Sequence, residues 1–414
     1  MDVVSQNDRE VLRALGRQYM EAAAEPRNTE TIKLWKALNS GRMERPMVNI
    51  DQLPHHELES DESLMCRVTD PFWRGVERGL RRKLYMWRHF PVDMVIEPFI
   101  RIPMAVSDSG YGVKDLEDVL VSDPKNDVVS HKYRPVIDED TDLSIITNRA
   151  FMHDDAETNR RLTEGGDIFA GVAPIHAHGV SFHLGIWDEL TKWLGVEECY
   201  IMIKDNPEFV HALLRKLTDS LLAGIRRVNE LQISDDAANI CHCSYVYDDA
   251  FLPAPGEGKG AVTGNSWAFG LAQLFSVVSP EVTKEFEMPY ISELAREFGS
   301  IYYGCCEGLS DRLDILKEIP NVRKISCSPW SDKAQFAERL AAPLILSYKP
   351  NPAFLATDVM DEGLIRRDLQ EISDLAKKHG KKLEIILKDV STVRYQPERL
   401  TRWNQIAMEV VKAW

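Results

Sequence analysis

The amino-acid sequence predicts an α/β protein, a (β/α)8 TIM-type barrel with an N-terminal helical extension. Short apolar segments alternate with helical patterns through the C-terminal half of the chain, which is typical of βαβ units and a parallel sheet. No predicted strand is followed by the glycine-rich fingerprint of a dinucleotide or phosphate loop, which argues against a Rossmann or P-loop protein. The length of 414 residues suits a barrel with an additional segment.

The helical extension is predicted over residues 1–90. Apolar residues recur at helical spacing in DREVLRALGRQYMEAAA and DPFWRGVERGLRRKLYMWRHF, and polar segments join these helices. We expect this segment to pack on the barrel. Residues 91–414 are then expected to form the barrel itself, which is the catalytic domain.

The first half of the predicted barrel has few clear strand patterns. We expect strands at residues 92–100 and 167–175, and a long helix over residues 206–231. Residues 199–205 fit either a buried strand or a helix. We favour the helix because no turn residues precede this segment.

The C-terminal half has the clearest pattern. Ser279 suits a helix N-cap and Pro280 suits the first helical position, so a helix is expected from there to about residue 298. Strands and helices should then alternate, with strands at residues 300–306, 322–327, 343–348 and 382–388, and helices at residues 310–318, 332–340, 362–379 and 396–412.

Composition and charge exclude several classes of protein. The chain is 44% hydrophobic and 28% charged, as ordinary globular proteins are. A formal net charge of −15 argues against binding to the phosphate backbone of nucleic acids, and the basic segment 78–88 is interpreted as a solvated helix face. No run of about 18 apolar residues is present, so no membrane span is expected.

The cysteines indicate a reducing compartment. The chain has seven of them, an odd number, and their spacing does not suggest a disulfide framework. The N-terminal sequence MDVVSQNDREVLRALGRQYM has neither an apolar core nor a cleavage signature of a secretory signal. We therefore expect a cytoplasmic protein.

Thiol and charged side chains follow the predicted strands of the C-terminal half. Active sites of TIM barrels are built at the carboxyl ends of the strands, and packing alone does not predict such residues there. The residues at these ends are Cys305, Cys306 and Glu307, then Cys327, then Lys349 and Asn351, and finally Lys388 and Asp389.

The adjacent cysteines favour a metal site over simple core filling. Side chains alternate across a strand, so only one of Cys305 and Cys306 should point into the barrel mouth, unless the strand ends before them. Cys306 and Cys327, on neighbouring strands, could supply two thiolates to a soft cation such as zinc. The alternative for Cys327 is that it is the buried last residue of its strand.

The segment ICHCSY, residues 240–245, offers a further candidate metal ligand. His242 could complete a zinc site, as could Glu307 or Cys243. In a strand, however, Cys241 and Cys243 would share one face and His242 would lie on the other, so the three side chains could not bind one ion.

Two histidines and two aspartates complete the candidates. His176 and His178, in HAHGVSFH, are expected to line the substrate site rather than to bind a metal. Asp248, in YDDAFLP, could act in acid–base catalysis or lie in a solvated turn. Asp389 ends the final strand in KDVSTVRY, where it could act as an acid or base or form an ion pair with Lys388.

The C-terminal part of the chain resembles the uroporphyrinogen decarboxylase superfamily, which includes the corrinoid-dependent methyltransferases. The resemblance rests on SPEVTKEFEMPYISELAREFG, CCEGLSDRLDIL, VRKISCSPW, KPNPAFLATD and EIILKDVSTVRYQPERLTRW, whose order and spacing fit the last four strands of that superfamily. The N-terminal part matches loosely. The chain is similar to a longer branch of anaerobe proteins and to first-component methyltransferases of O-demethylase systems.

Departures from the superfamily decide between its branches. The Arg-Gln-Ala-Gly-Arg stretch with which true uroporphyrinogen decarboxylases hold carboxylates does not occur. The His-x-Cys zinc motif of thiol-directed methyltransferases aligns with Gly304, Cys305 and Cys306, which keeps the cysteine and lacks the histidine. The later cysteine of that zinc set is missing from LKDVSTV, and the chain has no Asp-x-His-x-x-Gly motif for ligating a corrinoid.

The resemblance implies a methyltransferase that moves a methyl group from a small methylated compound, such as a methoxylated aromatic, to the corrinoid of a partner protein. A homodimer would suit such an enzyme. The expected roles are metal binding by Cys306, Cys305, Cys327 and His242, with zinc as the metal; catalysis by Glu307, Asp389 and Asp248; and substrate binding by His176, His178, Lys349, Asn351 and Lys388.

Two other functions fit the same residues. One is a lyase or decarboxylase that works without corrinoid, with Asp389 or Asp248 as the acid–base residue. The other is a non-catalytic barrel that binds a small molecule.

Overall fold

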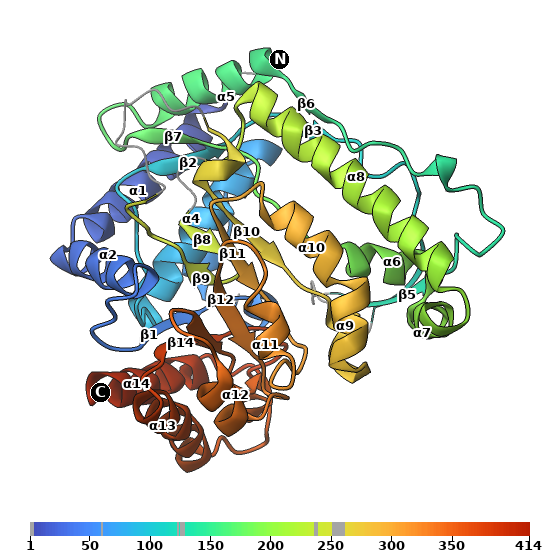
Figure 1. The fold of residues 1–414 in the computed structure, drawn as a ribbon. Helices are drawn as coiled ribbons and strands as arrows, with labels where there is room; N and C mark the ends of the chain where they lie inside the picture. The colour runs from blue at the N-terminus through green and yellow to red at the C-terminus, as the bar shows by residue number, and fades with distance from the viewer. Residues whose placement is uncertain (1–3, 59–60, 122–123, 125–128, 236–238, 251–260) are drawn as a thin grey trace.

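The computed structural model of the protein describes residues 4–58, 61–121, 124, 129–235, 239–250 and 261–414. A parallel sheet lies at its centre, with the strand order β1–β14–β13–β12–β11–β10 (Figure 1). Its six strands are β1 (Met47–Ile50), β10 (Trp267–Gly270), β11 (Ser300–Tyr303), β12 (Val322–Cys327), β13 (Ile345–Tyr348) and β14 (Lys382–Leu387).

This sheet is a curled half-barrel, and the described strands do not close it. Two further strands, β2 (Ile100–Pro103) and β7 (Ile175–His178), pair in parallel as a separate two-stranded sheet. An isolated parallel bridge between His183 and Phe269 extends the β10 edge. The predicted α/β class with a parallel sheet is confirmed, and the described strands form half of the predicted TIM-type barrel.

The two strands expected in the first half of the barrel begin later than predicted. The first, expected at residues 92–100, starts only at Ile100. In place of the second, expected at residues 167–175, helix α5 (Asp155–Ile168) runs on and a turn at Gly171 with φ of +69° follows. Pro98 and Pro174 lack the N–H that a central strand must donate, which explains why pairing begins after each of them.

The helices of the C-terminal half cover the outer side of the curled sheet (Figure 1). The helix expected at residues 280–298 is broken in two at Glu287, because Pro289 cannot continue the hydrogen-bond ladder of the first part. These helices are α9 (Pro280–Phe286), α10 (Met288–Ala295), α11 (Leu313–Leu316), α12 (Lys333–Arg339), α13 (Glu362–Lys378) and α14 (Glu398–Lys412).

Residues 1–90 supply helices and one strand. Strand β1 lies within this segment and pairs with β14, so the segment enters the main sheet as well as packing on it. Asp70 accepts a hydrogen bond from the backbone N–H of Trp73 and thereby caps α4. The helices are α1 (Gln6–Ala23), α2 (Pro26–Asn39), α3 (His55–Leu58) and α4 (Pro71–His89).

The middle of the chain is helical, with short antiparallel hairpins between the helices. The helices predicted at residues 199–205 and 206–231 are confirmed as α7 (Val196–Asp205) and α8 (Pro207–Leu231), and α6 (Ile186–Leu194) precedes them. The hairpins pair β4 (Leu116–Leu120) with β5 (Ser130–Arg134) and β8 (Ile240–Cys241) with β9 (Ser244–Tyr245). Strand β3 (Val106–Asp108) pairs antiparallel with β6 (Phe151–His153), and the β4–β5 hairpin lies between these two strands in the chain.

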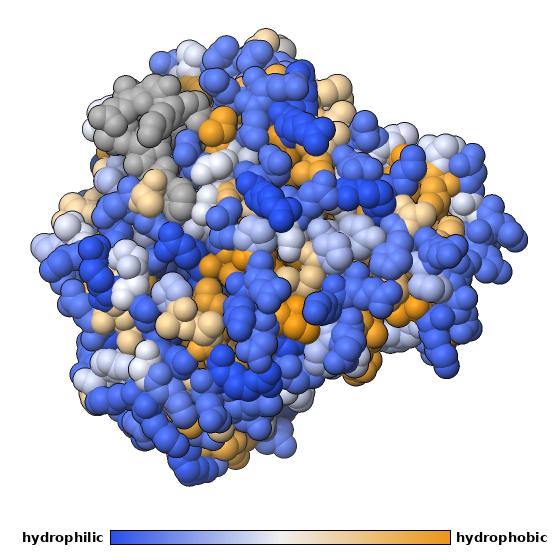
Figure 2. Space-filling model, in the orientation of Figure 1, coloured by the Kyte–Doolittle hydropathy of each residue, from blue (hydrophilic) through white to orange (hydrophobic). Residues whose placement is uncertain are grey.

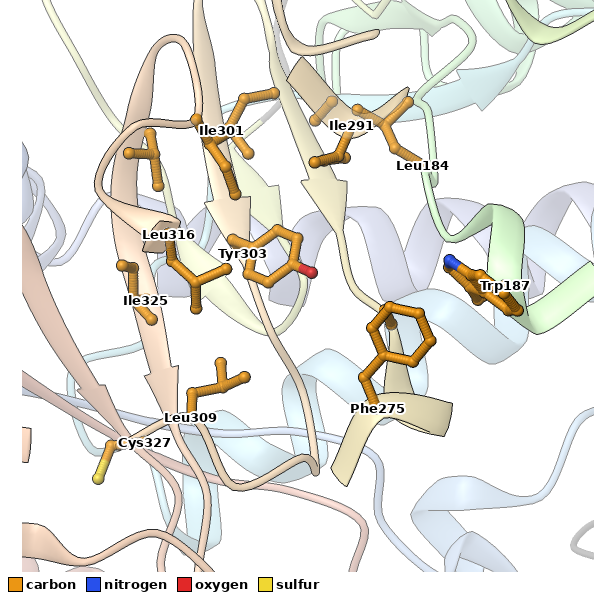
Figure 3. Close-up of a cluster of buried hydrophobic side chains, with 14 of the residues drawn as sticks. Leu184, Trp187, Phe275, Ile291, Ile301, Tyr303, Leu309, Leu316, Ile325 and Cys327 are labelled. Atoms are coloured by element: carbon orange, nitrogen blue, oxygen red, sulfur yellow. The ribbon is translucent and has the colours of Figure 1, made fainter. Parts of the chain in front are cut away.

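The two faces of the curled sheet differ in chemistry. The face toward the helices is apolar and packs Ile301, Tyr303 and Ile325 into the main core (Figure 3). The concave face carries a buried polar network, in which the ammonium of Lys324 lies 2.6 Å from the Glu384 carboxylate and both side chains are fully buried. Alternation of side chains along each strand produces this division.

The outer surface is mostly polar, as the high content of charged residues leads one to expect. The face shown in Figure 2 is mostly hydrophilic, and hydrophobic residues appear on it mainly as small patches near its middle. None of the described helices combines the length and the apolar character needed to cross a membrane.

Candidate functional site

The thiol pair lies at the carboxyl end of β11, and Gly304 places it there. The strand ends at Tyr303, and Gly304 has φ of +91°, a left-handed value that side chains rarely tolerate. A Cβ at this position would lie 2.5 Å from Leu309 Cδ1. Because the strand ends before the cysteines, alternation does not separate them, and the Sγ atoms of Cys305 and Cys306 lie 3.4 Å apart.

The end of β14 brings a cation and a carboxylate to the same point. The Nζ atom of Lys388 lies 3.0 Å from Cys305 Sγ and 2.7 Å from Asp389 Oδ2. That carboxylate oxygen lies 3.5 Å from Cys306 Sγ. Asp389 has a left-handed backbone, with φ of +56°, of the kind that accumulates at functional sites.

Cys305, Cys306 and Asp389 together form a donor set for a metal ion. One ligand atom from each lies within 4.8 Å of the other two, and the described residues contain no second group of three such side chains. Two thiolates with one carboxylate suit zinc, which binds cysteine, histidine and acidic ligands. The residues present therefore fit the expected metal.

Glu307 fixes the turn that carries the two thiols. Its side chain is 1% exposed, and its carboxylate accepts hydrogen bonds from the backbone N–H groups of Cys305, at 2.8 Å, and Ala272, at 3.4 Å. Burial raises the pKa of Glu307. The carboxyl group thus combines a positioning contact with an increased tendency to hold a proton.

The two thiols differ in acidity because they share one hydrogen bond. The bond from Cys306, with support from the nearby Lys388 ammonium, outweighs burial and lowers the pKa of Cys305 to about 7. The same bond, together with burial and the charge of Cys305, raises the pKa of Cys306. Although burial opposes it, the charges of Cys305 and Asp389 raise the pKa of Lys388. Above about pH 7, Cys305 is therefore mainly a thiolate while Cys306 stays a thiol.

A second lysine lies at the end of β13. Lys349 is 2% exposed, donates a hydrogen bond to Ser347 Oγ at 3.0 Å, and lies 5.0 Å over the ring of Tyr302. Burial lowers its pKa to about 8. Lys349 and Lys388 thus bring two ammonium groups to the concave side of the sheet.

Two of the predicted metal ligands lie apart from the thiol–carboxylate group. Cys327 belongs to the main core on the helix-covered face (Figure 3), because alternation along β12 turns it away from the concave face. His242 stacks on Phe269, with ring centroids 3.6 Å apart and planes 4° apart. Neither residue is a member of the group formed by the thiol pair and Asp389, so on this geometry neither completes the predicted zinc site.

Two other candidates make local contacts. Asn351 accepts a hydrogen bond from the N–H of Ala353 and caps the short turn that follows β13. Asp248 is buried and accepts a hydrogen bond from the N–H of Ala250. Both side chains stabilise the turns that carry them. Among the described contacts, neither side chain touches the thiol pair.

The two histidines of β7 lie near the separate two-stranded sheet. The His176 ring centroid lies 5.2 Å from that of Phe99. His178 Nδ1 lies 3.1 Å from Asp235 Oδ2, and Arg101 lies 3.3 Å from the same carboxylate. These side chains belong to a charged cluster on the β2–β7 side.

Several polar residues near the site have no motif-like signal in the sequence. Asp51 follows β1, and burial raises its pKa against the hydrogen bonds from Gln52 and Cys243. Asp188 lies 3.9 Å from His183, and burial with the charge of Glu307 raises its pKa to about 7. The position of Asp51 after a strand is the one cue that could have marked it.

Comparisons with known proteins bear on the fold. No protein-family model matches the chain, and no curated protein matches its sequence. Among solved structures, the chain is similar to a methyltransferase from Methanosarcina mazei, with a TM-score of 0.51 and 11% sequence identity. The match covers 92% of this chain and 98% of that chain. At this identity the likeness concerns the fold.

Proposed function

We propose that this protein is a methyltransferase that takes a methyl group from a small methylated donor, such as a methoxylated aromatic compound, and passes it to the corrinoid of a partner protein. The observation that carries the proposal is the group of Cys305, Cys306 and Asp389 at the carboxyl edge of a parallel sheet, where TIM-type enzymes have their active sites. The fold shared with a known methyltransferase adds support.

Removal of a methyl group from an ether or amine is difficult because the heteroatom is a poor leaving group. Zinc bound by Cys306, Cys305 and Asp389 would supply Lewis acidity at that heteroatom. The chain's own residues act around it. Lys388 balances the charge of the thiolate and Asp389. Burial raises the pKa of Glu307, which lies in the same turn as the thiol pair, and so favours its protonated form.

The proposed substrate contacts come from the lysines. Lys349 and Lys388 lie on the concave side, where Lys349 has hydrogen-bonding capacity beyond its contact with Ser347. An ammonium group has three donors, so Lys349 can bind an oxygen atom of the donor and orient the molecule over the thiol pair.

The metal content of anaerobically purified protein tests the proposal. We expect about one zinc per chain in the wild type, and loss of the metal in Cys306→Ala. Cys327→Ala is the matched control, because its thiol lies in the core on the helix side and its removal should leave the metal bound. A wild type without metal, or equal loss in both variants, would contradict the proposed site.

Methyl transfer is tested next with the metal-loaded protein. Candidate donors are incubated with a reduced corrinoid protein, and methylation of the cobalt is followed by its absorption spectrum. We expect transfer in the wild type and none in Cys306→Ala. Metal without transfer to any corrinoid protein would favour the lyase alternative, in which Asp389 or Asp248 acts as the acid–base residue.

A further inference from the structure

His242 lies in a turn with an unusual backbone. Strands β8 and β9 pair Cys241 with Ser244, so His242 and Cys243 alone form the hairpin loop. Both have left-handed φ values, +45° and +66°, as a two-residue primed turn requires. Such turns favour Asn-Gly, because residues with larger side chains are strained there. Strain of this kind is retained mainly at functional sites.

The turn is held in place by its surroundings. Asn49 Nδ2 donates a hydrogen bond to the Cys243 carbonyl at 2.8 Å, and Ser244 Oγ donates to Glu384 at 2.8 Å. Lys324 Nζ donates to the Tyr245 carbonyl at 3.2 Å. The hairpin is thus fixed to the concave face by β1, β12 and β14, and these contacts offset the cost of the strained turn.

The imidazole of His242 has an unused hydrogen-bonding atom. Its Nε2 is buried and has no hydrogen-bond partner among the described residues. One ring face stacks on Phe269, and the centroid of Tyr302 lies 5.2 Å away. An unpaired buried polar atom is costly, and native proteins pair most of them.

His242 is kept neutral by burial and by nearby ammonium groups, and these ammonium groups belong to lysines of the candidate site. Burial, followed by the ammonium groups of Lys349 and Lys388, lowers its pKa. A neutral imidazole has one donor and one acceptor nitrogen. His242 as a whole is half-buried while its Nε2 is buried, so contact of this nitrogen with a bound molecule requires the ring to turn about its soft terminal torsion.

We propose that His242 is a specificity-determining residue that contacts the methyl donor, with its imidazole hydrogen-bonded to a hydroxyl group on the flat ring of that molecule. The inference rests on the proposed function. The stacked rings of Phe269 and His242 suit a flat donor, and a hydroxyl group can pair with either nitrogen. The strained turn sets this side chain beside Phe269 and Tyr302, apart from the three candidate metal ligands.

The test compares two probes that differ in one hydroxyl group. Binding of 2-methoxyphenol and of methoxybenzene is measured by calorimetry with the anaerobically purified protein. We expect the wild type to bind 2-methoxyphenol about three- to tenfold more tightly, as one hydrogen bond allows. His242→Phe keeps a ring against Phe269 and lacks the nitrogen, so this difference should disappear while the zinc content stays unchanged.

Two further variants separate specificity from folding. His242→Asn suits the left-handed backbone, so it should unfold at a higher temperature than the wild type while losing the preference for 2-methoxyphenol. Cys243→Gly also relieves strain and keeps the imidazole, so it should retain the preference. This combination of gained stability and lost discrimination is not expected of a merely structural residue.

Three results would overturn the inference. They are a wild type that does not prefer 2-methoxyphenol, a His242→Phe variant that keeps the preference, and zinc lost from His242→Phe. The third would instead make His242 a metal ligand. Failure of the proposed function gives a different result. The wild type would then lack zinc or methyl transfer, while its preference for 2-methoxyphenol would still depend on His242.

Discussion

The ammonium of Lys388 lies 3.0 Å from Cys305 Sγ and 2.7 Å from Asp389 Oδ2, so one cation bridges a thiol and a carboxylate that come from the ends of different strands. Lys388 is only 4% exposed, which limits screening of these contacts by water. In the metal-free chain this ammonium supplies the positive charge that the two potential ligands require. The ends of β11 and β14 are therefore coupled electrostatically as well as by proximity.

Replacement of Lys388 by Met should raise the pKa of Cys305. In the wild type the thiol pKa is lowered to about 7, so in chelator-treated protein its reaction with iodoacetamide should increase with pH through a midpoint near 7. Without the ammonium, the midpoint should move upward toward the ordinary value. Peptide mass spectrometry of alkylation at Cys305 across a pH series measures the shift.

Lys333→Met is the control for this experiment. Lys333 forms ion pairs with Asp368 and Glu371 on the helix side of the sheet, and it has no recorded contact with the thiol pair. Its replacement should leave the alkylation midpoint unchanged. An unchanged midpoint in Lys388→Met as well would mean that the ammonium does not control the acidity of Cys305.

Gly304→Ala should disturb the site and destabilise the protein. The new Cβ would lie 2.5 Å from Leu309 Cδ1 and 3.2 Å from Ser326 Cβ, on a backbone with φ of +91°. We expect a loss of about 1–3 kcal/mol in the free energy of unfolding, with reduced metal binding because the turn carries both thiols. Chemical denaturation and metal analysis measure the two effects.

Gly308→Ala provides the matched comparison in the same turn. Its added Cβ would have its closest contact at 3.4 Å, to the Trp330 carbonyl oxygen, which is an ordinary van der Waals distance. This variant should keep both the stability and the metal. Equal effects of the two substitutions would show that the special backbone of Gly304 is not what positions the cysteines.

The sequence predicted the regular elements of the C-terminal half better than their ends. The bounds of β12 were predicted correctly at residues 322–327, because turn-forming residues stand on both sides of it, Pro320 and Asn321 before it and Ser328 and Pro329 after it. Strand β11 was expected to reach residue 306 and ends at Tyr303, because Gly304 turns the chain. The contact between the two thiols depends on this early end of the strand, which takes residues 304–306 out of it. Neither the composition nor the hydrophobic period of the segment reveals a left-handed φ in advance.

The residues of the candidate site could be predicted where they follow a strand. They could not be predicted where tertiary contacts determine which face of the sheet a side chain lies on. The rule that barrel chemistry follows the strands placed Cys305, Cys306 and Asp389 among the strand-end candidates, and the structure brings one ligand atom of each within 4.8 Å of the other two. It also selected Cys327, which ends a strand and faces the helices, because the rule does not say which face of the sheet is concave. The alternation argument for His242 holds only in a strand, whereas this residue occupies a turn that its residue type does not favour.

Lys324→Met should cause a large loss of stability. Lys324 and Glu384 are fully buried, and the substitution leaves the carboxylate with hydrogen bonds from Ser244 and Ser347 and no positive partner in direct contact. Breaking one side of a buried ion pair costs about 3–5 kcal/mol, and we expect that decrease in the free energy of unfolding. Urea denaturation at neutral pH measures it.

The double variant Lys324→Met/Glu384→Gln distinguishes charge from packing. Removing the carboxylate charge as well should recover part of the lost stability, because the remaining cost is then that of imperfect packing and hydrogen bonding. If the double variant is as unstable as the sum of the two single variants, the pair does not interact as its 2.6 Å separation indicates.

Glu57→Gln should loosen the segment that follows β14. Glu57, in α3, is 5% exposed, and its carboxylate accepts hydrogen bonds from Thr392 Oγ1 at 2.5 Å, Val393 N at 2.7 Å and Tyr395 N at 3.0 Å. An amide in its place has only one acceptor oxygen and turns an NH2 group toward backbone donors. Hydrogen exchange at residues 390–395 should therefore become faster, with a loss of about 1–3 kcal/mol in stability. Glu409→Gln removes the carboxylate with which α14 forms an exposed ion pair to Arg366 of α13, and it should change neither quantity. Equal exchange rates in the wild type and Glu57→Gln would show that the Glu57 carboxylate does not anchor the segment next to Asp389.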